Sequence, residues 1–390
     1  MQVPQAGPTG VVVYIITKLE LGGAQKVCLS LLKNVAARGM KTILISGPHG
    51  PLVPQAQLLC DEVYLLPSLQ REVGLFSLFK EGLAFLHMTF VLWQLRRKYG
   101  EITVHTHSTK AGIMGRWAAW FAGAQRIVHT VHGFGFHAYQ MAVVWWLHYV
   151  LEYVTSWVTS AYVCVSSVDK AQGEELLPYF ERRSNLIRAA IEWDTFTVSA
   201  QEVRPARLLH EAKSQRLRIG TISCFKPQKN LIHLFEAVRR LVNDDGIAVD
   251  LEVVGDGEQA PALFAWTVKH GLQEVITFRG WQYEVAPLMR EWDVFALSSL
   301  WEGLPCAIIE ARLLQLPVVA YNVGGIAEVI TDKHNGILLQ PGDVNGLYQA
   351  LKTVALDARL RQSLAKADND LTPFSDSVMA QQHAALYKQL

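Results

Sequence analysis

The sequence predicts an α/β protein made of two doubly wound parallel-sheet domains. Short runs rich in β-branched residues alternate with longer segments of helical period along most of the chain. This alternation pauses once, in a polar stretch at residues 192–216, and then restarts. Half of the 390 residues are hydrophobic, and this length exceeds what one core usually supports, so we expect two cores.

The first half of the chain supplies the first predicted sheet. Its apolar runs carry no charged side chains, as expected for strands that are covered on both faces. Because helical segments separate these strands, the strands are expected to be parallel. The predicted strands are 11–17, 42–46, 63–66, 102–107, 127–132 and 161–165, and the predicted helices are 27–37, 75–99, 111–122 and 142–159.

The second half repeats the same alternation and supplies the second predicted sheet. We place the domains at residues 1–195 and 196–372, and expect residues 373–390 to form a helix that packs back on the first domain. The predicted strands are 217–223, 249–254, 275–278, 294–297 and 318–321, and the predicted helices are 231–242, 261–270, 285–292 and 306–314.

Composition argues against several classes of protein. The formal net charge of +1 gives no support for a nucleic-acid partner, which usually requires a clustered basic excess. The cysteines are scattered without a CxxC pair, so we expect reduced thiols rather than a disulfide framework or a zinc site. These cysteines are Cys28, Cys60, Cys164, Cys224 and Cys306.

Two segments bear on location. The first 25 residues lack a basic region ahead of their short apolar run, so we expect a first strand rather than a signal peptide, and a cytoplasmic protein. Between Arg126 and Glu152 there is no Asp, Glu, Lys or Arg, but histidines and glycines interrupt the apolar run. We therefore expect no transmembrane helix, and leave open a face that touches a membrane surface.

Two glutamates mark the carboxyl end of a strand in the second half. Glu302 lies in the loop that follows the strand 294–297, and Glu310 lies on the next predicted helix. Ligands of open α/β sheets bind at this edge. A carboxylate accepts hydrogen bonds from sugar or ribose hydroxyls, while Gly303 permits close backbone approach. The alternative is that both glutamates are solvated surface residues.

The surrounding motifs identify a family. The segment ALSSLWEGLPCAIIEARLLQLPVVAYNVGGIAEVI, followed by NGILLQPGD, strongly resembles the group 1 (family 4) retaining glycosyltransferases of GT-B fold. The resemblance covers nearly the whole chain and includes, in order, HTHSTKAG, TVHGFG, CVSS, GTISCFKPQKN and VGDGE. It implies two Rossmann-like domains that face a central cleft, with the acceptor bound by the first domain and the nucleotide sugar by the second.

The resemblance assigns roles to the residues of this motif. It implies that Glu302 holds donor-sugar hydroxyls and that Glu310 holds the nucleotide ribose. Gly303, Leu304 and Pro305 lie between them and are expected to line the donor site. The free N–H groups of the helix that follows would suit a diphosphate.

The first strand is followed by Gly22 and Gly23, which open a helix. Such a turn can cradle a phosphate, although it is also compatible with a plain tight turn. The motif is not GxGxxG, so the sequence gives no support for a dinucleotide cofactor, and we expect no cofactor. In the family this loop lies over the donor diphosphate.

Lys229 follows a strand and precedes a helix in FKPQKN, where a family lysine binds the donor phosphates. An ammonium group there would stabilise the departing nucleoside diphosphate without a metal. The alternative is a solvated lysine at a helix start. The usual family arginine aligns with Cys224, so Lys226 is the candidate for the second cation.

His132 ends a predicted strand and matches a family histidine near the donor sugar, although a lone histidine is more often a core or surface group. His107 ends a neighbouring strand and is a candidate acceptor contact, whereas His105 is expected to be structural. Three further donor-site candidates follow strands of the second half. These are Gly255 and Asp256, with a plain turn as the alternative, and Trp281, near the base.

Aromatic side chains crowd the first half at helical spacing, including Trp145, Trp146 and Trp157. They form either a core stripe or an interfacial face that reaches a lipid-linked acceptor. Arg96, Arg97 and Lys98 end another apolar stretch and would suit anionic lipid. A peripheral position on the inner face of the plasma membrane is therefore an alternative to a purely cytoplasmic one.

The function expected from these features is retaining glycosyl transfer from a nucleotide sugar to a polyprenyl-diphosphate-linked glycan, in cell-surface polysaccharide or glycan assembly. A UDP-sugar is the favoured donor and a GDP-sugar the alternative, and no metal is expected. Two other functions stay open: a non-catalytic nucleotide- or glycan-binding protein, and a sugar-nucleotide epimerase on the same scaffold. An epimerase would need no acceptor.

Overall fold

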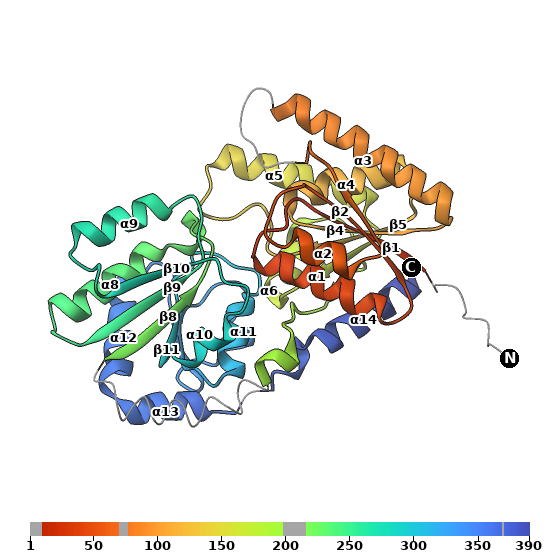
Figure 1. Ribbon diagram of the computed structural model, residues 1–390. Coiled ribbons are helices and arrows are strands. Elements are labelled where there is room, and N and C mark those ends of the chain that lie inside the picture. The colour runs from red at the N-terminus through yellow and green to blue at the C-terminus, as the bar shows by residue number, and fades with distance from the viewer. Residues whose placement is uncertain (1–9, 70–76, 198–215, 369) are drawn as a thin grey trace. The chain divides into compact units, whose positions relative to one another are not determined.

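A computed structural model describes residues 10–69, 77–197, 216–368 and 370–390 (Figure 1). Contacts divide the chain into two compact units, each built on one parallel sheet. The first unit comprises Met1–Ala190 with Phe374–Leu390, and the second comprises Ile191–Pro373. The prediction of two doubly wound parallel-sheet domains is confirmed.

The first unit holds a seven-stranded sheet in the order β3-β2-β1-β4-β5-β6-β7, and all neighbouring strands are parallel. The order reverses between β1 and β4, so the connections that leave these two strands run in opposite directions. Its strands are β1 (Val11–Ile16), β2 (Lys41–Ser46), β3 (Glu62–Leu65), β4 (Thr103–His107), β5 (Arg126–Val131), β6 (Ala161–Cys164) and β7 (Ser184–Leu186).

Helices connect these strands and bury their apolar sides against the sheet. One core cluster joins the long helix α3 to β1 and β4, with Met88 and Leu92 packed near Val13 and Val104. Two short helices, α2 and α6, and the three-residue strand β7 lie outside the sequence prediction. The helices are α1 (Gly23–Ala36), α2 (Val53–Leu59), α3 (Ser77–Tyr99), α4 (Thr109–Phe121), α5 (Ala142–Thr155), α6 (Ser167–Leu176) and α14 (Asp376–Gln389).

The terminal helix α14 packs on α1 and reaches the middle of the first sheet. The hydroxyl of Tyr387 lies 3.0 Å from that of Tyr14 on β1 and 2.5 Å from Nδ1 of His105 on β4. All three side chains are buried. These hydrogen bonds attach the chain's last helix to strands more than 250 residues earlier.

The second unit holds a six-stranded parallel sheet in the order β10-β9-β8-β11-β12-β13. The order reverses between β8 and β11. Right-handed connections that run in opposite directions cover opposite faces of a sheet, so α8 and α11 lie on different sides of it (Figure 1). The strands are β8 (Leu217–Ile222), β9 (Val249–Val254), β10 (Ile276–Gly280), β11 (Val294–Leu297), β12 (Val318–Tyr321) and β13 (Gly336–Leu339).

The helices of this unit include two at its end that the sequence analysis did not place, α12 and α13. α12 packs side by side with α8 and completes one layer. The helices are α8 (Leu231–Asn243), α9 (Ala260–Lys269), α10 (Ala286–Arg290), α11 (Cys306–Leu313), α12 (Val344–Leu356) and α13 (Ala358–Lys366). In the described part of the chain, no helix combines the length and apolar character needed to cross a membrane.

A buried ion pair fastens three elements of the first unit. Arg116 of α4 donates from Nη1 and Nη2 to the two carboxylate oxygens of Glu152 on α5, each at 2.7 Å. Nη1 also donates to Thr159, just before β6, at 3.1 Å. Arg116 is fully buried and Glu152 is 5% exposed, so each charge depends on the other for its stabilisation.

We expect Arg116→Met to lower the free energy of unfolding by about 3–5 kcal/mol, because it leaves the Glu152 carboxylate buried and unpaired. The double variant Arg116→Met/Glu152→Leu removes both charges and should recover much of this loss. Chemical unfolding followed by circular dichroism measures both. A double variant that is less stable than the single variant would show that the unpaired charge is not the cause.

Candidate active site

The strongest cluster of candidate residues lies where β8 and β11 end side by side. Lys229 closes the short 3-10 turn after β8, and Glu302 lies in the loop after β11. Lys229 Nζ lies 2.5 Å from Oε1 of Glu302. Gln228 Nε2 donates to Oε2 of Glu302 at 3.4 Å and to the carbonyl of Trp301 at 2.7 Å. Both oxygens of this carboxylate are therefore held by the β8 loop.

Backbone hydrogen bonds between the two loops fix this geometry. The Leu300 N–H donates to the Gln228 carbonyl at 2.8 Å, and the Ser298 hydroxyl lies within hydrogen-bonding distance of the carbonyls of Lys229 and Asn230. Asn230 adopts a left-handed backbone with φ of 46°, a conformation that asparagine tolerates better than most residues. The turn there ends the Lys229 segment and starts α8.

Glu310 lies on α11, and its side chain is almost fully buried. The loop that leads into this helix is backed by the chain after β12. The Gly325 N–H donates to the Gly303 carbonyl at 2.6 Å, and a Cβ at Gly324 would collide with the carbonyl of Glu302. Gly324 also has a positive φ of 54°. The position of this Gly-Gly pair is that of a support for the Glu302 loop.

The loops after β9 and β10 meet the β8 loop at the same edge. The Phe225 N–H donates to the Asp256 carbonyl at 2.9 Å, and the Gly255 N–H donates to the Gly280 carbonyl at 2.8 Å. Gly255 has a φ of 124°, and a Cβ there would collide with the carbonyl of Ser223. Trp281 follows Gly280 and is half-buried, as is Lys226. Lys226, Gly255, Asp256 and Trp281 thus share the edge with Lys229, Glu302, Gly303, Leu304, Pro305 and Glu310.

The first unit has a corresponding edge between β1 and β4. Gly22 caps the start of α1, and Gly23 begins that helix. The hydroxyls of Thr17 and Ser108, which follow β1 and β4, lie 2.8 Å apart. Ser108 has a φ of 63°, which is uncommon for a residue other than glycine. Ser108 could not be predicted from the sequence, because its backbone conformation leaves no mark there.

Two predicted histidines contact each other at this edge. His107 ends β4 and His132 follows β5, and His107 Nδ1 lies 3.0 Å from His132 Nε2. His107 is fully buried, whereas His132 is half-buried. His107 therefore lies behind His132. Its role as an acceptor contact stays a prediction, because its side chain is not exposed to a ligand.

The two histidines belong to a larger buried group of imidazoles. The ring of His105 stacks with the rings of His107 and His383, at centroid distances of 4.5 and 5.5 Å. Burial, together with the nearby His383, lowers the pKa of His132 to about 4. Burial likewise lowers the pKa of His383 to about 4 and those of His105 and His107 well below the usual value. All four imidazoles are neutral at pH 7.

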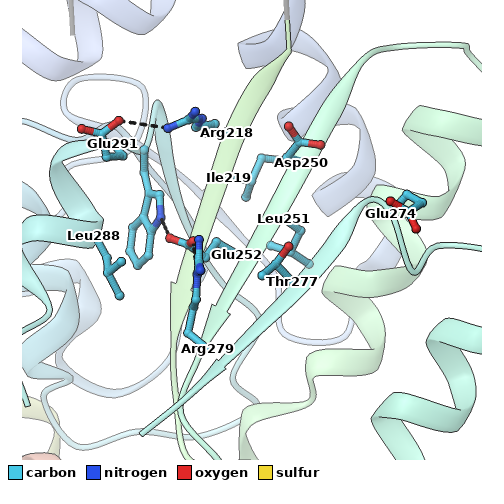
Figure 2. A pocket seen from close by; sticks show the side chains of 11 residues that line it. Arg218, Ile219, Asp250, Leu251, Glu252, Glu274, Thr277, Arg279, Leu288 and Glu291 are labelled. Carbon is cyan, nitrogen blue, oxygen red and sulfur yellow. Dashed lines mark hydrogen bonds and ion pairs between the residues drawn. The ribbon is translucent and has the colours of Figure 1, made fainter. Parts of the chain in front are cut away.

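A cavity of about 340 Å³ lies elsewhere, on a face of the second sheet (Figure 2). Its lining residues come from the first half of β8, from β9 and β10, and from the segment before β11. Trp292 stands over Gly220 and donates to Glu252 at 2.6 Å, while Arg218 pairs with Glu291 at 3.0 Å. None of the predicted site residues lines this cavity, so it is separate from the edge that carries Lys229 and Glu302.

Solved structures with the same architecture show the fold class. The chain matches the UDP-glucose complex of Anabaena HepE with a TM-score of 0.78, 19% identity and coverage of 97% of this chain and 100% of that one. It matches sucrose-phosphate synthase of Thermosynechococcus elongatus with a TM-score of 0.79 and 20% identity, over 97% and 98% of the two chains. The fold is therefore GT-B.

The family follows from the sequence matches. Residues 21–191 match the model of Glycosyltransferase Family 4, and residues 216–357 match that of Glycosyl transferases group 1. The chain belongs to this family of glycosyltransferases, which confirms the resemblance seen in its motifs. A relative from Escherichia coli, UDP-Gal:alpha-D-GlcNAc-diphosphoundecaprenol alpha-1,3-galactosyltransferase, is 28% identical over 86% of either chain.

We expect the free energy of unfolding to fall between pH 6.5 and 4, and to fall less steeply in a His383→Leu variant. The unfolded histidine takes up a proton below about pH 6.5, whereas the folded one stays neutral down to about pH 4. Each such group contributes up to about 1.4 kcal/mol per pH unit.

Urea midpoints at pH 7, 6 and 5 measure this dependence for both proteins. The comparison uses the slope with pH, because the loss of packing in the variant shifts all its midpoints together. Parallel slopes would contradict the assignment of the acid sensitivity to His383.

Proposed function

We propose that this glycosyltransferase moves a sugar, with retention of configuration, from a UDP-sugar to a polyprenyl-diphosphate-linked glycan in cell-surface polysaccharide assembly. The observation that carries the proposal is the contact of Lys229 with Glu302 at the point where the strand order reverses, in a chain of this family. The Escherichia coli relative, whose name specifies UDP-Gal and a diphosphoundecaprenol-linked acceptor, supports the donor and acceptor classes.

Each residue of the second-unit edge has a proposed task. Lys229 stabilises the negative charge that grows on the departing diphosphate, and Lys226, half-buried in the same loop, adds a second cation in place of the family arginine. Glu302 accepts hydrogen bonds from sugar hydroxyls, and Glu310 accepts them from the ribose. Without donor, Lys229 and Glu302 neutralise each other, so neither charge is left unpaired at 17% and 7% side-chain exposure.

We propose that the first unit supplies the acceptor site and the remaining donor contacts. Gly22 and Gly23 bring backbone N–H groups to the carboxyl edge of β1. His132 offers a neutral imidazole at the end of β5, suited to a hydrogen bond with a sugar hydroxyl.

The donor and acceptor are tested with purified protein, a panel of UDP- and GDP-sugars, and polyprenyl-diphosphate-linked GlcNAc. We expect acceptor-dependent transfer from a UDP-sugar, with UDP-galactose as the first candidate, and an α-linked product by NMR. An altered nucleotide sugar formed without acceptor would identify an epimerase instead. Binding without turnover across the panel would favour the non-catalytic alternative.

We further propose that the enzyme works at a membrane surface. The helices α3, α4 and α5 are neighbours in the first unit (Figure 1). They expose many large apolar side chains. Trp146 is 58% exposed and Trp157, just after α5, is 60% exposed. We call the exposed large apolar side chains of these elements the aromatic face and propose that they lie on one surface; they include Leu83, Leu86, Phe90, Trp93, Trp120, Phe121, Val143, Trp146, Leu147, Val150 and Trp157.

Cations border the aromatic face. The guanidinium of Arg97 lies 4.4 Å from the ring centroid of Trp93 on the last turns of α3, beside Arg96 and Lys98. Tryptophan suits the headgroup layer because it has an apolar body and a polar tip, and each cation near an anionic surface adds about 1 kcal/mol. Such a position would bring the enzyme to a lipid-linked acceptor.

We expect Glu302→Gln and Glu310→Gln each to lower kcat/KM about ten- to a hundredfold, because each removes a charged hydrogen-bond acceptor for the donor. Glu274→Gln, an exposed carboxylate of the same unit, is the matched control and should keep full activity. Steady-state kinetics with unchanged circular dichroism spectra make the comparison. Near-wild-type kcat/KM in both site variants would contradict the assignment.

We expect transfer to persist in EDTA. Lys229 and Lys226 would supply the positive field that a divalent ion provides in metal-dependent transferases. Initial rates are compared with and without the chelator. Activity lost in EDTA and restored by magnesium or manganese would contradict this role of the lysines.

We expect the double variant Trp146→Ser/Trp157→Ser to bind anionic liposomes about tenfold more weakly than wild type, since it removes two apolar anchors. Tyr283→Ser is the control, because Tyr283 is equally exposed, at 62%, but lies in the second unit. Co-sedimentation at low and high salt measures binding. No binding of the wild type at low salt, with efficient transfer to a soluble acceptor, would exclude the membrane proposal.

A further inference from the structure

The contact between His107 and His132 constrains where their protons lie. In a neutral imidazole one ring nitrogen carries a proton and the other accepts a hydrogen bond. Across the 3.0 Å contact, either His107 Nδ1–H donates to His132 Nε2, or His132 Nε2–H donates to His107 Nδ1. The two arrangements differ in whether the second nitrogen of each ring, His107 Nε2 and His132 Nδ1, carries a proton.

The surroundings of His107 distinguish the two arrangements. Its Nε2 is buried and has no hydrogen-bond partner among the described residues. If His132 donated, His107 would carry its proton on this nitrogen and leave a buried N–H without an acceptor. If His107 donates from Nδ1, its Nε2 carries no proton and is a hydrogen-bond acceptor without a donor. In proteins, buried N–H groups without an acceptor are rarer than buried acceptor atoms without a donor, so the arrangement in which His107 donates is favoured.

His383 provides an internal precedent two rings away. Its Nδ1 lies 2.8 Å from the carbonyl oxygen of Met379, which can only accept, so Nδ1 carries the proton. The Nε2 of His383 is then an unprotonated acceptor, and it too is buried without a partner among the described residues. If His107 also carries its proton on Nδ1, both histidines have the same feature, an unprotonated and buried Nε2 without a hydrogen-bond donor.

We infer that His107 is a positioning residue, which holds His132 as the neutral tautomer with its proton on Nδ1. His132 Nδ1 makes no hydrogen bond to the described residues and is not among their buried polar atoms that lack a partner, and the residue is half-buried, so this nitrogen is accessible to a ligand at the end of β5. His132 thus presents an N–H donor to an oxygen of the substrate, and the inference rests on the proposed function for its effect on activity.

A chemical consequence separates this role from acid–base catalysis. With Nε2 occupied by His107, the exposed nitrogen of His132 already carries a proton and cannot accept another. Burial keeps the second nitrogen unprotonated by holding the pKa of His132 near 4. His132 therefore binds a sugar hydroxyl or phosphate oxygen without removing a proton from the acceptor.

The tautomer is measured in the unmodified 390-residue chain. Protein labelled with 15N-histidine gives long-range 1H–15N spectra at pH 7, in which the protonated and unprotonated ring nitrogens have different 15N shifts. The His132 signals are identified by their loss in His132→Phe. We expect Nδ1 to be the protonated nitrogen, and a protonated Nε2 would overturn the inference whatever the activity.

Two matched variants test whether His107 sets this tautomer. His107→Asn keeps an amide N–H near the place of Nδ1, whereas His107→Leu has a similar shape and no hydrogen bond. Both lose the ring, so a loss of packing affects both. We expect His132 to keep its proton on Nδ1 in the His107→Asn variant and to be a mixture of both tautomers in the His107→Leu variant. We expect kcat to be about two- to tenfold lower in His107→Leu than in His107→Asn.

The outcomes separate the two proposals. Equal tautomer populations and equal kcat in the Asn and Leu variants would overturn the positioning role of His107. A wild-type protein that transfers no sugar from any donor would contradict the proposed function, while its NMR spectrum would still decide the tautomer of His132. If both variants fail to fold, the wild-type tautomer alone decides.

Discussion

The ion pair between Lys229 and Glu302 depends on the direction of two parallel strands. β8 and β11 are neighbours in the sheet although they are far apart in sequence, and both end at the same edge. The connections that leave them run in opposite directions, so no helix crosses the edge between them. A lysine from one loop and a glutamate from the other can therefore meet there, at 2.5 Å.

The loops around this pair are arranged to keep it in place. Gln228 occupies the second carboxylate oxygen, and backbone hydrogen bonds join the β8 loop to the loops after β9 and β11. Gly324 provides the close backbone approach that a side chain would prevent. Geometry of this kind reduces the reorganisation needed when charge develops on a bound phosphate, which is how a preorganised site contributes to catalysis.

The histidine side chains at the carboxyl edge of the first sheet are neutral, whereas the side chains at the carboxyl edge of the second sheet include a charged pair. The edge of the first sheet at the end of β4 and β5 is backed by stacked imidazoles, and burial keeps these rings uncharged. The terminal helix α14 contributes Tyr387, which is hydrogen-bonded to His105, and His383, whose ring stacks with that of His105. The two halves of the fold thus present different chemistry: a paired cation and anion in one, and hydrogen-bonding imidazole and backbone N–H groups in the other.

The sequence by itself determined the alternation of strands and helices, the parallel sheets, and the place of Glu302, Lys229 and His132 at strand ends, because these follow from local period and residue type. It missed α2, α6, β7, β13, α12 and α13, which are short or lie beyond its last predicted strand, and it missed Gln228, Ser108 and Tyr387. Strand order, which makes β8 and β11 neighbours, was decided only by tertiary packing. So were the burial of His107 and the exposure of Trp146, because helical period shows which face is apolar but not what covers it.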